Sequence, residues 1–389
     1  MITHIYSILL AFFFILINNQ GFSQPITVFK SGTDGHKSYR IPAIISLPNG
    51  DLLAFAEGRV NNSADFGDIN LVMKRSQDKG KTWSPMETLV DQDKLQAGNP
   101  APVVDLCDPD YPNGVVYLFY NTGNNHESEV RKGNGVREVL YIKSYDFGKT
   151  WDPPVNITLQ THKPFQPTYD PNYQFKEGWR TYANTPGHAF QFLQGLYKGR
   201  IYIAANHSAN GPQERYTDHY AHGFYTDDHG KTFKISDNIN IPGSNEAIAT
   251  ELSNNRMMMS VRNQKGDIRR RILAYSSDGG ASWDTAYFDQ QLPDPVCQGT
   301  LLTLGYKKGK AIVAHCNAAD EKLRDNLTLR ISEDEGKTWK TSIVIDKSAV
   351  SGKRDWTAYS DLVKVGKKIG VFYERNGYAE IVFKVVSWK

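Results

Sequence analysis

"SQDKGKTW" (Ser76–Trp83) is the first of five octets that repeat one pattern along this chain of 389 residues. The pattern is a hydroxyl residue, any residue, Asp, any residue, Gly, any residue, Thr or Ser, and an aromatic residue. The other copies are SYDFGKTW (144–151), TDDHGKTF (226–233), SSDGGASW (276–283) and SEDEGKTW (332–339). Five copies of one pattern indicate a chain built from repeated units.

Each octet is expected to form a turn after a short strand. Its Asp and hydroxyl side chains can bond amides of the same turn, its Gly supplies a positive φ, and its aromatic ring can bury the turn against the protein body. Short β-type runs precede the octets, namely INLVMKR, EVLYIK, AHGFY, RRILAY and LTLRI. We therefore interpret the octets as structural residues that take no part in chemistry.

The spacing of the octets predicts the number of repeats. Their aspartates at 78, 146, 228, 278 and 334 are separated by 68, 82, 50 and 56 residues, a mean of 64. The 366 residues that follow residue 23 hold close to six units of that length, and no helical period extends beyond two turns. Repeated four-stranded units predict an all-β fold, a six-bladed β-propeller with short protected sheet edges.

The N-terminus has the features of a secretory signal peptide. An apolar run, Ile8–Ile17, is about half as long as a membrane span requires, and small residues stand at Gly21 and Ser23. We predict a signal peptide at residues 1–23, one propeller domain over 24–389, no transmembrane span, and a secreted or periplasmic location. The 45 basic and 42 acidic side chains leave a net charge of +3, which does not favour a nucleic-acid partner, and we expect a monomer.

Cysteine and histidine spacing gives no indication of a metal site. Cys107, Cys297 and Cys316 are too few and too scattered for a disulfide framework or a zinc site. Cys297 and Cys316 flank a predicted hairpin with its turn at 307–310, so they form either a cross-strand disulfide or two buried thiols. His219 and His222 have no HExxH or CxxC spacing around them. No metal or other cofactor is expected.

"SYRIPAIISLPNGDLLAFAEGR" (38–59) reads as a hairpin with an arginine near its mouth. A strand-end arginine such as Arg40 is usually a solvated edge charge. The octets, however, are the motif known as Asp-boxes, and together with "YRIP" (39–42) they make the chain resemble the bacterial exo-sialidases, or neuraminidases. This glycoside hydrolase family has six-bladed propellers, and the resemblance runs from about Ser31 to the C-terminus. It implies hydrolysis of terminal sialic acids from sialylated glycoproteins, glycolipids and oligosaccharides.

The resemblance implies an arginine triad that binds the substrate carboxylate. Sialic acid carries a carboxylate on its anomeric carbon, and the planar guanidinium pairs with a carboxylate through two hydrogen bonds. The matching positions are Arg40, Arg262 at the end of RMMMSVR, and Arg324 in LRDNLTLRIS. Arg330 competes for the third role and ranks lower, because it adjoins the last Asp-box.

The same carboxylate would repel an anionic nucleophile. The family uses a tyrosine whose proton is taken by a glutamate, giving a covalent sialyl-tyrosine and retained configuration. Tyr359 in DWTAYSDL matches the tyrosine motif. SNEAIATEL holds two glutamates, and Glu246, 16 residues before Arg262, matches the family pattern better than Glu251.

The acid that protonates the leaving oxygen is expected on an early loop. Asp65 in SADFGD fits, whereas its rival Asp68 directly precedes a strand and can cap it. By the same comparison, Arg59 lies beside the sugar, and Glu374 and Glu57 orient arginines. Two alternatives share part of this pattern: a trans-sialidase with the same residues, and an Asp-box propeller that binds glycans without turnover.

Overall fold

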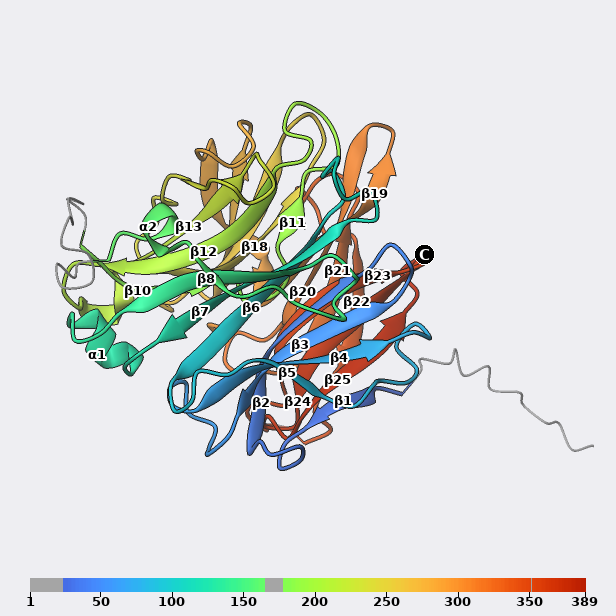
Figure 1. The fold of residues 1–389 in the computed structure, drawn as a ribbon. Coiled ribbons are helices and arrows are strands. Elements are labelled where there is room, and N and C mark those ends of the chain that lie inside the picture. The colour runs from blue at the N-terminus through green and yellow to red at the C-terminus, as the bar shows by residue number, and fades with distance from the viewer. Residues whose placement is uncertain (1–23, 165–177, 351) are drawn as a thin grey trace, which may run out of the picture.

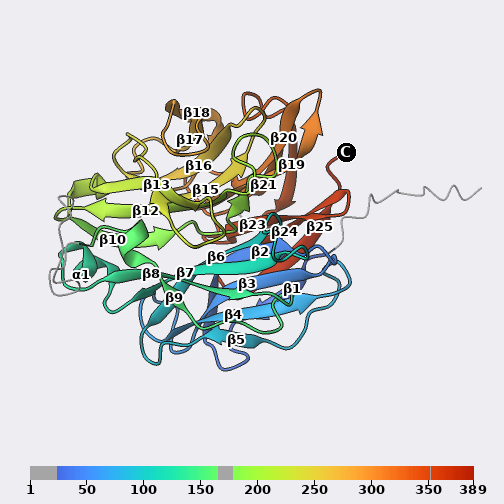
Figure 2. The same cartoon turned by 45° about the horizontal axis from the view of Figure 1, so that its top comes forward.

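The computed structural model describes residues 24–164, 178–350 and 352–389, which form six antiparallel blades arranged around a central axis (Figures 1 and 2). The predicted all-β six-bladed propeller is therefore confirmed. The predicted signal peptide, residues 1–23, lies outside the described residues. None of the helices in the described part of the chain has the length and apolarity needed to cross a bilayer.

Each blade consists of four consecutive positions in a sheet, numbered here from the strand nearest the axis outward. Blade 1 is β2 (Ser38–Ser46), β3 (Leu52–Arg59), β4 (Ile69–Ser76) and β5 (Glu87–Val90), and blade 2 is β6 (Gln96–Asp105), β7 (Val115–Gly123), β8 (Arg137–Ser144) and β9 (Val155–Asn156). Blade 3 is β10 (Trp179–Asn184) with β11 (Phe190–Gln191), β12 (Ile201–Ala209), β13 (His219–Thr226) and β14 (Lys234–Ile235). Blade 4 is β15 (Ser244–Glu251), β16 (Met257–Asn263), β17 (Arg270–Ser276) and β18 (Thr285–Pro293).

Blade 5 is β19 (Gly299–Lys307), β20 (Lys310–Ala318), β21 (Leu327–Ser332) and β22 (Thr341–Asp346). Blade 6 is β23 (Thr357–Val365), β24 (Lys368–Arg375), β25 (Glu380–Val386) and β1 (Ile26–Lys30). β1 pairs with β25, so the two ends of the domain share one blade and close the ring. Short helical turns, α1 (Glu127–Arg131), α2 (Thr158–Thr161) and η1 (Glu214–Tyr216), lie in the connections.

The Asp-boxes form the predicted turns at the end of the third strand in blades 1 to 5. In the first box, Asp78 Oδ1 accepts the amides of Lys81 and Thr82 at 2.9 Å each, and its Oδ2 accepts the Thr82 hydroxyl at 2.6 Å. The amide of Gly80 donates to Ser76 Oγ at 2.8 Å. The Asp-to-hydroxyl bond recurs in the other four boxes, which confirms their structural role.

The box glycines also bring neighbouring blades into contact. Gly80 of blade 1 has φ +85° and faces Phe383 of blade 6, where an added Cβ would lie 2.0 Å from the ring. Gly280 of blade 4 faces Tyr202 of blade 3 in the same way, at 2.4 Å. Trp83, the last residue of the first box, packs edge-on against Phe383 with 5.5 Å between ring centroids. Each box therefore seals its blade against the preceding one.

Blade 3 contains a group of buried imidazoles. His162, His207 and His222 have no exposed surface. His207 stacks on Trp179 with 3.5 Å between centroids and lies 3.2 Å, Nδ1 to Nδ1, from His222. Burial lowers the pKa of His162 and of His222 to about 3. Both rings are therefore neutral in the folded protein at neutral pH.

Acid should destabilise the fold through these imidazoles. Because their folded pKa lies below the unfolded value of about 6.5, the stability they contribute is complete above that value and is lost as the pH falls toward 3. Between pH 6.5 and 4.5 we expect a loss of roughly 1–3 kcal/mol per imidazole, measured by urea unfolding. His162→Phe should reduce this loss, whereas His126→Gln at an exposed position should not. An unchanged pH dependence in His162→Phe would contradict the assignment.

Candidate active site

A pocket of about 320 Å³ opens at the face where the innermost strands begin. It is lined by residues from blades 1 to 6, and eight of the nine predicted site residues are among them: Arg40, Glu57, Arg59, Asp65, Glu246, Arg262, Arg324 and Tyr359. The ninth, Glu374, lies fully buried behind Arg40. The structure thus brings together side chains that are up to 334 positions apart in the sequence.

Arg40 is aimed into the pocket by an irregularity near the start of β2. The β2–β3 register shifts between Arg40 and Ala43, and Ile41 adopts φ 58°. Glu374 Oε1 accepts both Arg40 Nε at 2.7 Å and the amide of Ile41 at 2.9 Å. Burial alone would lower the pKa of Arg40, but Glu374 raises it above its usual value. The predicted orienting role of Glu374 therefore has a direct structural counterpart.

Arg262, Glu246 and Tyr359 form a closed triangle. The Tyr359 hydroxyl donates to Glu246 Oε1 at 2.5 Å, while Arg262 Nη1 donates to Glu246 Oε2 at 2.6 Å and to the Tyr359 oxygen at 2.9 Å. Burial first, and then the Glu246 charge, raise the pKa of Tyr359 well above 10, although Arg262 and Arg324 act in the opposite direction. At rest the phenol therefore keeps its proton, which is already directed at a carboxylate.

Arg324 completes the group of three guanidiniums. Its Nη1 donates to the Tyr378 hydroxyl at 3.0 Å, and its guanidinium lies 5.6 Å from the Tyr359 ring centroid. Arg330, the rival, instead donates to Asn317 Oδ1 at 3.3 Å and is not among the pocket-lining residues. Tyr378 also lies under Arg40, 4.0 Å from guanidinium to ring centroid. It thus links two members of the triad, a role that sequence reasoning missed.

Asp65 stands at the rim of the pocket and is held by Arg59. Arg59 Nη1 donates to Asp65 Oδ1 at 2.7 Å, and its Nη2 donates to Glu57 Oε2 at 2.7 Å. Burial raises the pKa of Asp65, but Arg59, Arg40 and Arg324 outweigh it, so the net shift is downward. Glu57 holds the Arg59 guanidinium in place, because its Oε2 accepts from both Nε and Nη2. Asp68 is not a lining residue and stands directly before β4.

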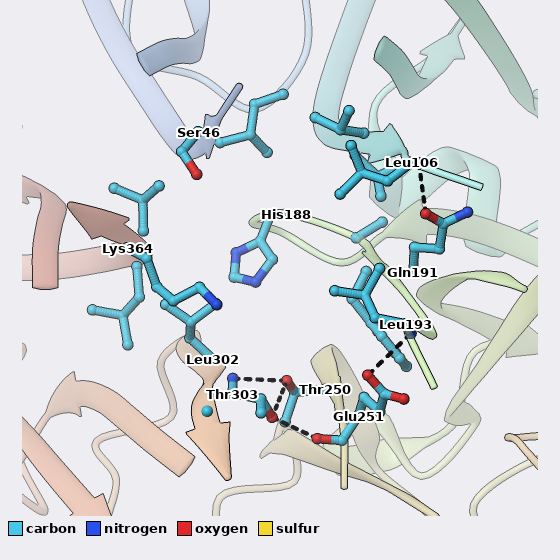
Figure 3. Close-up of a pocket in the computed structure, with 18 of the residues that line it drawn as sticks. Ser46, Leu106, His188, Gln191, Leu193, Thr250, Glu251, Leu302, Thr303 and Lys364 are labelled. Carbon is cyan, nitrogen blue, oxygen red and sulfur yellow. Dashed lines mark hydrogen bonds between the residues drawn. The ribbon is translucent and has the colours of Figure 1, made fainter. Parts of the chain in front are cut away.

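Glu251 is excluded from this pocket because it lies at the other end of β15. There it lines a separate cavity of about 340 Å³ where the innermost strands end (Figure 3). Its carboxylate accepts the amides of Leu193 at 3.1 Å and Gln194 at 3.2 Å, so its hydrogen bonds serve the fold. Of the two glutamates in SNEAIATEL, only Glu246 contacts Tyr359.

Sequence reasoning missed the residues that blades 2 and 3 contribute. The lining residues without a prior assignment on these blades are Gln96, Asn99, Glu127, Arg137, Thr181, Tyr182, Ala183, Asn206 and Tyr216. No motif or spacing distinguishes these residues from ordinary strand and loop residues. They come together because, in these antiparallel blades, the first and third strands begin and the second strand ends at the same mouth of the propeller, where the connections with α1 and η1 also lie.

Among the residues that the structure describes, no cysteine or histidine lines the pocket. Cys297 and Cys316 are both buried free thiols, so the disulfide alternative is wrong. Within the described ranges, one group has metal-ligand character, Asp105 with Asp108 and His229, and none of its members lines the pocket.

A family model described as a BNR repeat-like domain matches residues 50–371 of the chain. The chain belongs to this family. The sialidase of Micromonospora viridifaciens is 28% identical over 342 residues, which are 82% of this chain and 48% of that protein. The sialidase of Bacteroides fragilis is 26% identical over 385 residues, 94% of this chain and 64% of that protein. The chain thus spans about half to two thirds of the length of these two relatives.

The fold is also shared with solved sialidase structures. The Hadza microbial sialidase Hz136 superposes with a TM-score of 0.76 at 22% identity, covering 93% of this chain and 68% of that one. The resemblance to the sialidase family drawn from the Asp-boxes and "YRIP" is thereby confirmed. Over most of its length the chain is thus similar to proteins named sialidases.

Proposed function

We propose that the protein is an exo-α-sialidase that releases terminal sialic acids through a covalent sialyl-tyrosine intermediate. The observation that carries the proposal is the 2.5 Å contact between the Tyr359 hydroxyl and Glu246 beside the converging guanidiniums of Arg40, Arg262 and Arg324. A neutral phenol paired with a base suits a substrate whose reacting carbon already bears a carboxylate. Membership in the sialidase family supports the same substrate class.

The three guanidiniums are suited to hold the substrate carboxylate. The Glu374 carboxylate neutralises Arg40 from behind, and the Glu246 carboxylate neutralises Arg262 from one side. Their remaining donors, with those of Arg324, line the pocket. Charge-assisted pairs of this kind fix both the position and the orientation of a planar carboxylate. The anomeric carbon is thereby presented to the Tyr359 oxygen.

In the first step, the Tyr359 oxygen bonds to the anomeric carbon while its proton passes to Glu246. The bond from that carbon to the glycosidic oxygen breaks, and Asp65 donates a proton to the departing oxygen. In the second step, water attacks the same carbon, its proton passes to Asp65, and the tyrosine oxygen leaves and recovers its proton from Glu246. Two displacements retain the anomeric configuration.

Asp65 needs a proton that it lacks in the free protein, because Arg59, Arg40 and Arg324 lower its pKa. A bound substrate carboxylate would neutralise Arg40 and Arg324, and the sugar would shield Asp65 from water. Both changes raise the pKa of Asp65 at the moment when the proton is required. Substrate binding therefore prepares the acid.

Transfer of the sugar to an acceptor alcohol would use the same residues, and hydrolysis is the default because water needs no binding site of its own. A propeller that only binds glycans has no need of the Tyr359–Glu246 contact.

The proposal includes a secreted or periplasmic location, which rests on the apolar run Ile8–Ile17. Incubation with a fluorogenic sialoside tests the activity directly, and absence of turnover would refute it.

Each triad arginine should contribute to binding. Replacing Arg40, Arg262 or Arg324 with Ala should weaken binding of the planar unsaturated analogue of sialic acid by about 2–5 kcal/mol, because each change removes one partner of a charged pair. Lys replacements should recover only part of the affinity, since a point charge cannot form two parallel bonds. Calorimetric titration measures the effect, and normal affinity would remove that arginine from the site.

Tyr359 should carry the covalent adduct. A 3-fluorinated sialosyl fluoride slows the second displacement more than the first, so the intermediate should accumulate. Mass spectrometry of the digested protein should find the sugar on Tyr359 and on no peptide of a Tyr359→Phe variant. Label on another residue would overturn the assignment of the nucleophile.

Loss of Asp65 should affect substrates according to their leaving groups. Asp65→Ala should reduce kcat/KM for a natural sialoside, whose alcohol must be protonated, by roughly 100-fold or more. An aryl sialoside should be affected far less, because its phenolate departs with little protonation. Asp68→Ala is the matched control and should leave both rates near those of the wild type. Equal losses on both substrates in Asp65→Ala would mean that Asp65 is not the acid.

A further inference from the structure

A second cavity, of about 340 Å³, lies at the end of the propeller where the innermost strands finish, opposite the candidate active site. All six blades contribute to its wall, and none of the described residues lines both cavities. Leu106 and Leu193 line it and are 49% and 50% exposed, so its opening is apolar as well. An apolar wall with few polar groups is typical of a small-molecule site. Apolar side chains form most of this wall, among them Ile44, Val103, Phe190, Leu302 and Leu362.

Several polar side chains of the wall are already engaged within the fold. The hydroxyls of Thr250 and Thr303 lie 2.9 Å apart and hydrogen-bond each other. The amide group of Gln191 donates through its nitrogen at 2.6 Å and accepts through its oxygen at 2.7 Å. The carboxylate of Glu251 accepts two backbone amides. These groups therefore have little bonding capacity left for a ligand.

His188 is the exception. Its Nδ1 lies 2.7 Å from Asp361 Oδ1, and Asp361 also accepts the amide of Ile44 and the hydroxyl of Thr300. Asp361 thus acts as an acceptor, and Nδ1 carries the ring proton. Nε2 forms no hydrogen bond with any residue in the described part of the chain. Figure 3 shows the ring in the middle of the lining side chains, and the residue is only 7% exposed.

An enclosed polar atom without a partner costs free energy unless a ligand or a water molecule satisfies it. In the neutral ring with its proton on Nδ1, Nε2 is a hydrogen-bond acceptor. The complement of one acceptor in an apolar wall is an apolar molecule with one donor. A hydroxyl group is such a donor and brings no charge into the cavity.

The charges around the cavity disfavour an ionic ligand. A ligand anion near Nε2 would face the Asp361 carboxylate behind the ring and the Glu251 carboxylate on the wall. A ligand cation would face Lys364, which also lines the cavity. We propose that this cavity binds a small uncharged alcohol or phenol, whose hydroxyl donates to His188 Nε2 while its apolar body packs against the wall. The site is separate from the candidate active site, so the proposal does not depend on the proposed function.

The test uses phenol and toluene, which have nearly the same shape and differ in the hydroxyl group. Each is titrated into the full chain carrying nitrogen-15 in its histidines, and binding is followed by NMR. The His188 signals are those that a His188→Asn variant lacks. Phenol should bind saturably and shift the Nε2 signal of His188, because that atom gains a hydrogen bond.

His188→Asn also separates the acceptor from the rest of the cavity. The Asn amide nitrogen can take the place of Nδ1 and donate to Asp361, but nothing replaces Nε2. The ratio of phenol affinity to toluene affinity should therefore be roughly 3- to 10-fold lower in this variant than in the wild type, the value of one hydrogen bond. Comparing ratios removes the difference in hydrophobicity between the two probes. An unchanged ratio would overturn the assignment of His188.

A second pair of variants locates the binding site. Leu302→Trp fills part of the cavity and should weaken phenol binding by about tenfold or more, because the larger ring occupies the same space. Leu304→Trp is the matched control, since Leu304 lies on the same strand and is not a lining residue. Its phenol affinity should stay near that of the wild type. Thermal unfolding verifies that each variant folds, and if His188→Asn does not fold, the Nε2 shift and the Leu302 and Leu304 variants decide.

Benzoate and benzylammonium test the charge of the ligand. Both should bind about tenfold or more weakly than phenol, because an ion loses its hydration in an apolar cavity. Equal or tighter binding of either ion would overturn the proposed ligand class. Absence of saturable phenol binding would show that the cavity holds only water, and an unchanged phenol affinity in Leu302→Trp would show that phenol binds elsewhere. Either result would overturn the proposal.

Discussion

One buried carboxylate, Asp361, ties the centre of the propeller together. It has no exposed surface and accepts hydrogen bonds from the amide of Ile44 in blade 1, from the amide and Nδ1 of His188 in blade 3, and from the Thr300 hydroxyl in blade 5. A charged acceptor of this kind favours one relative position of the inner strands. Tyr359, the proposed nucleophile, is two residues earlier on the same strand, so this network also fixes its position.

The pocket side chains depend on irregular pairing at the opening end of the inner strands. In five of the six described blades the register between the first and second strands shifts there, as between Arg40 and Ala43 or between Ser244 and Ala247. A bulge turns side chains away from the regular alternation of a strand and is common beside active sites. The regular blades thus supply rigidity, and the bulges direct Arg40 and Glu246 toward the axis.

The parts of the molecule that were predictable from sequence are those encoded locally. An Asp-box bonds to itself within eight residues, so its pattern survives in a single sequence and its spacing counts the blades. Arg40, Glu246 and Tyr359 were identified through short motifs of a known family. Arg137 and Tyr378 were not, because their place in the site depends on cross-strand register and on contacts between blades, which no local pattern records. Across blade 2, for example, Gln96 pairs with Gly123 and Gly123 pairs with Arg137.

The pocket is suited to an anion because of where its charged side chains lie, and not because of the small net charge of +3. Glu374 is fully buried and pairs with Arg40 from behind, whereas Glu57 is almost completely buried and pairs with Arg59 at the pocket wall. Each pair offsets the cost of burying a guanidinium, and Arg59 still donates to Asp65 at the rim of the pocket. Glu246 differs, because its second oxygen binds the Tyr359 hydroxyl. In the proposed mechanism, Glu246 therefore does two things at once: one of its oxygens accepts from the binding arginine Arg262, and the other takes the proton of Tyr359.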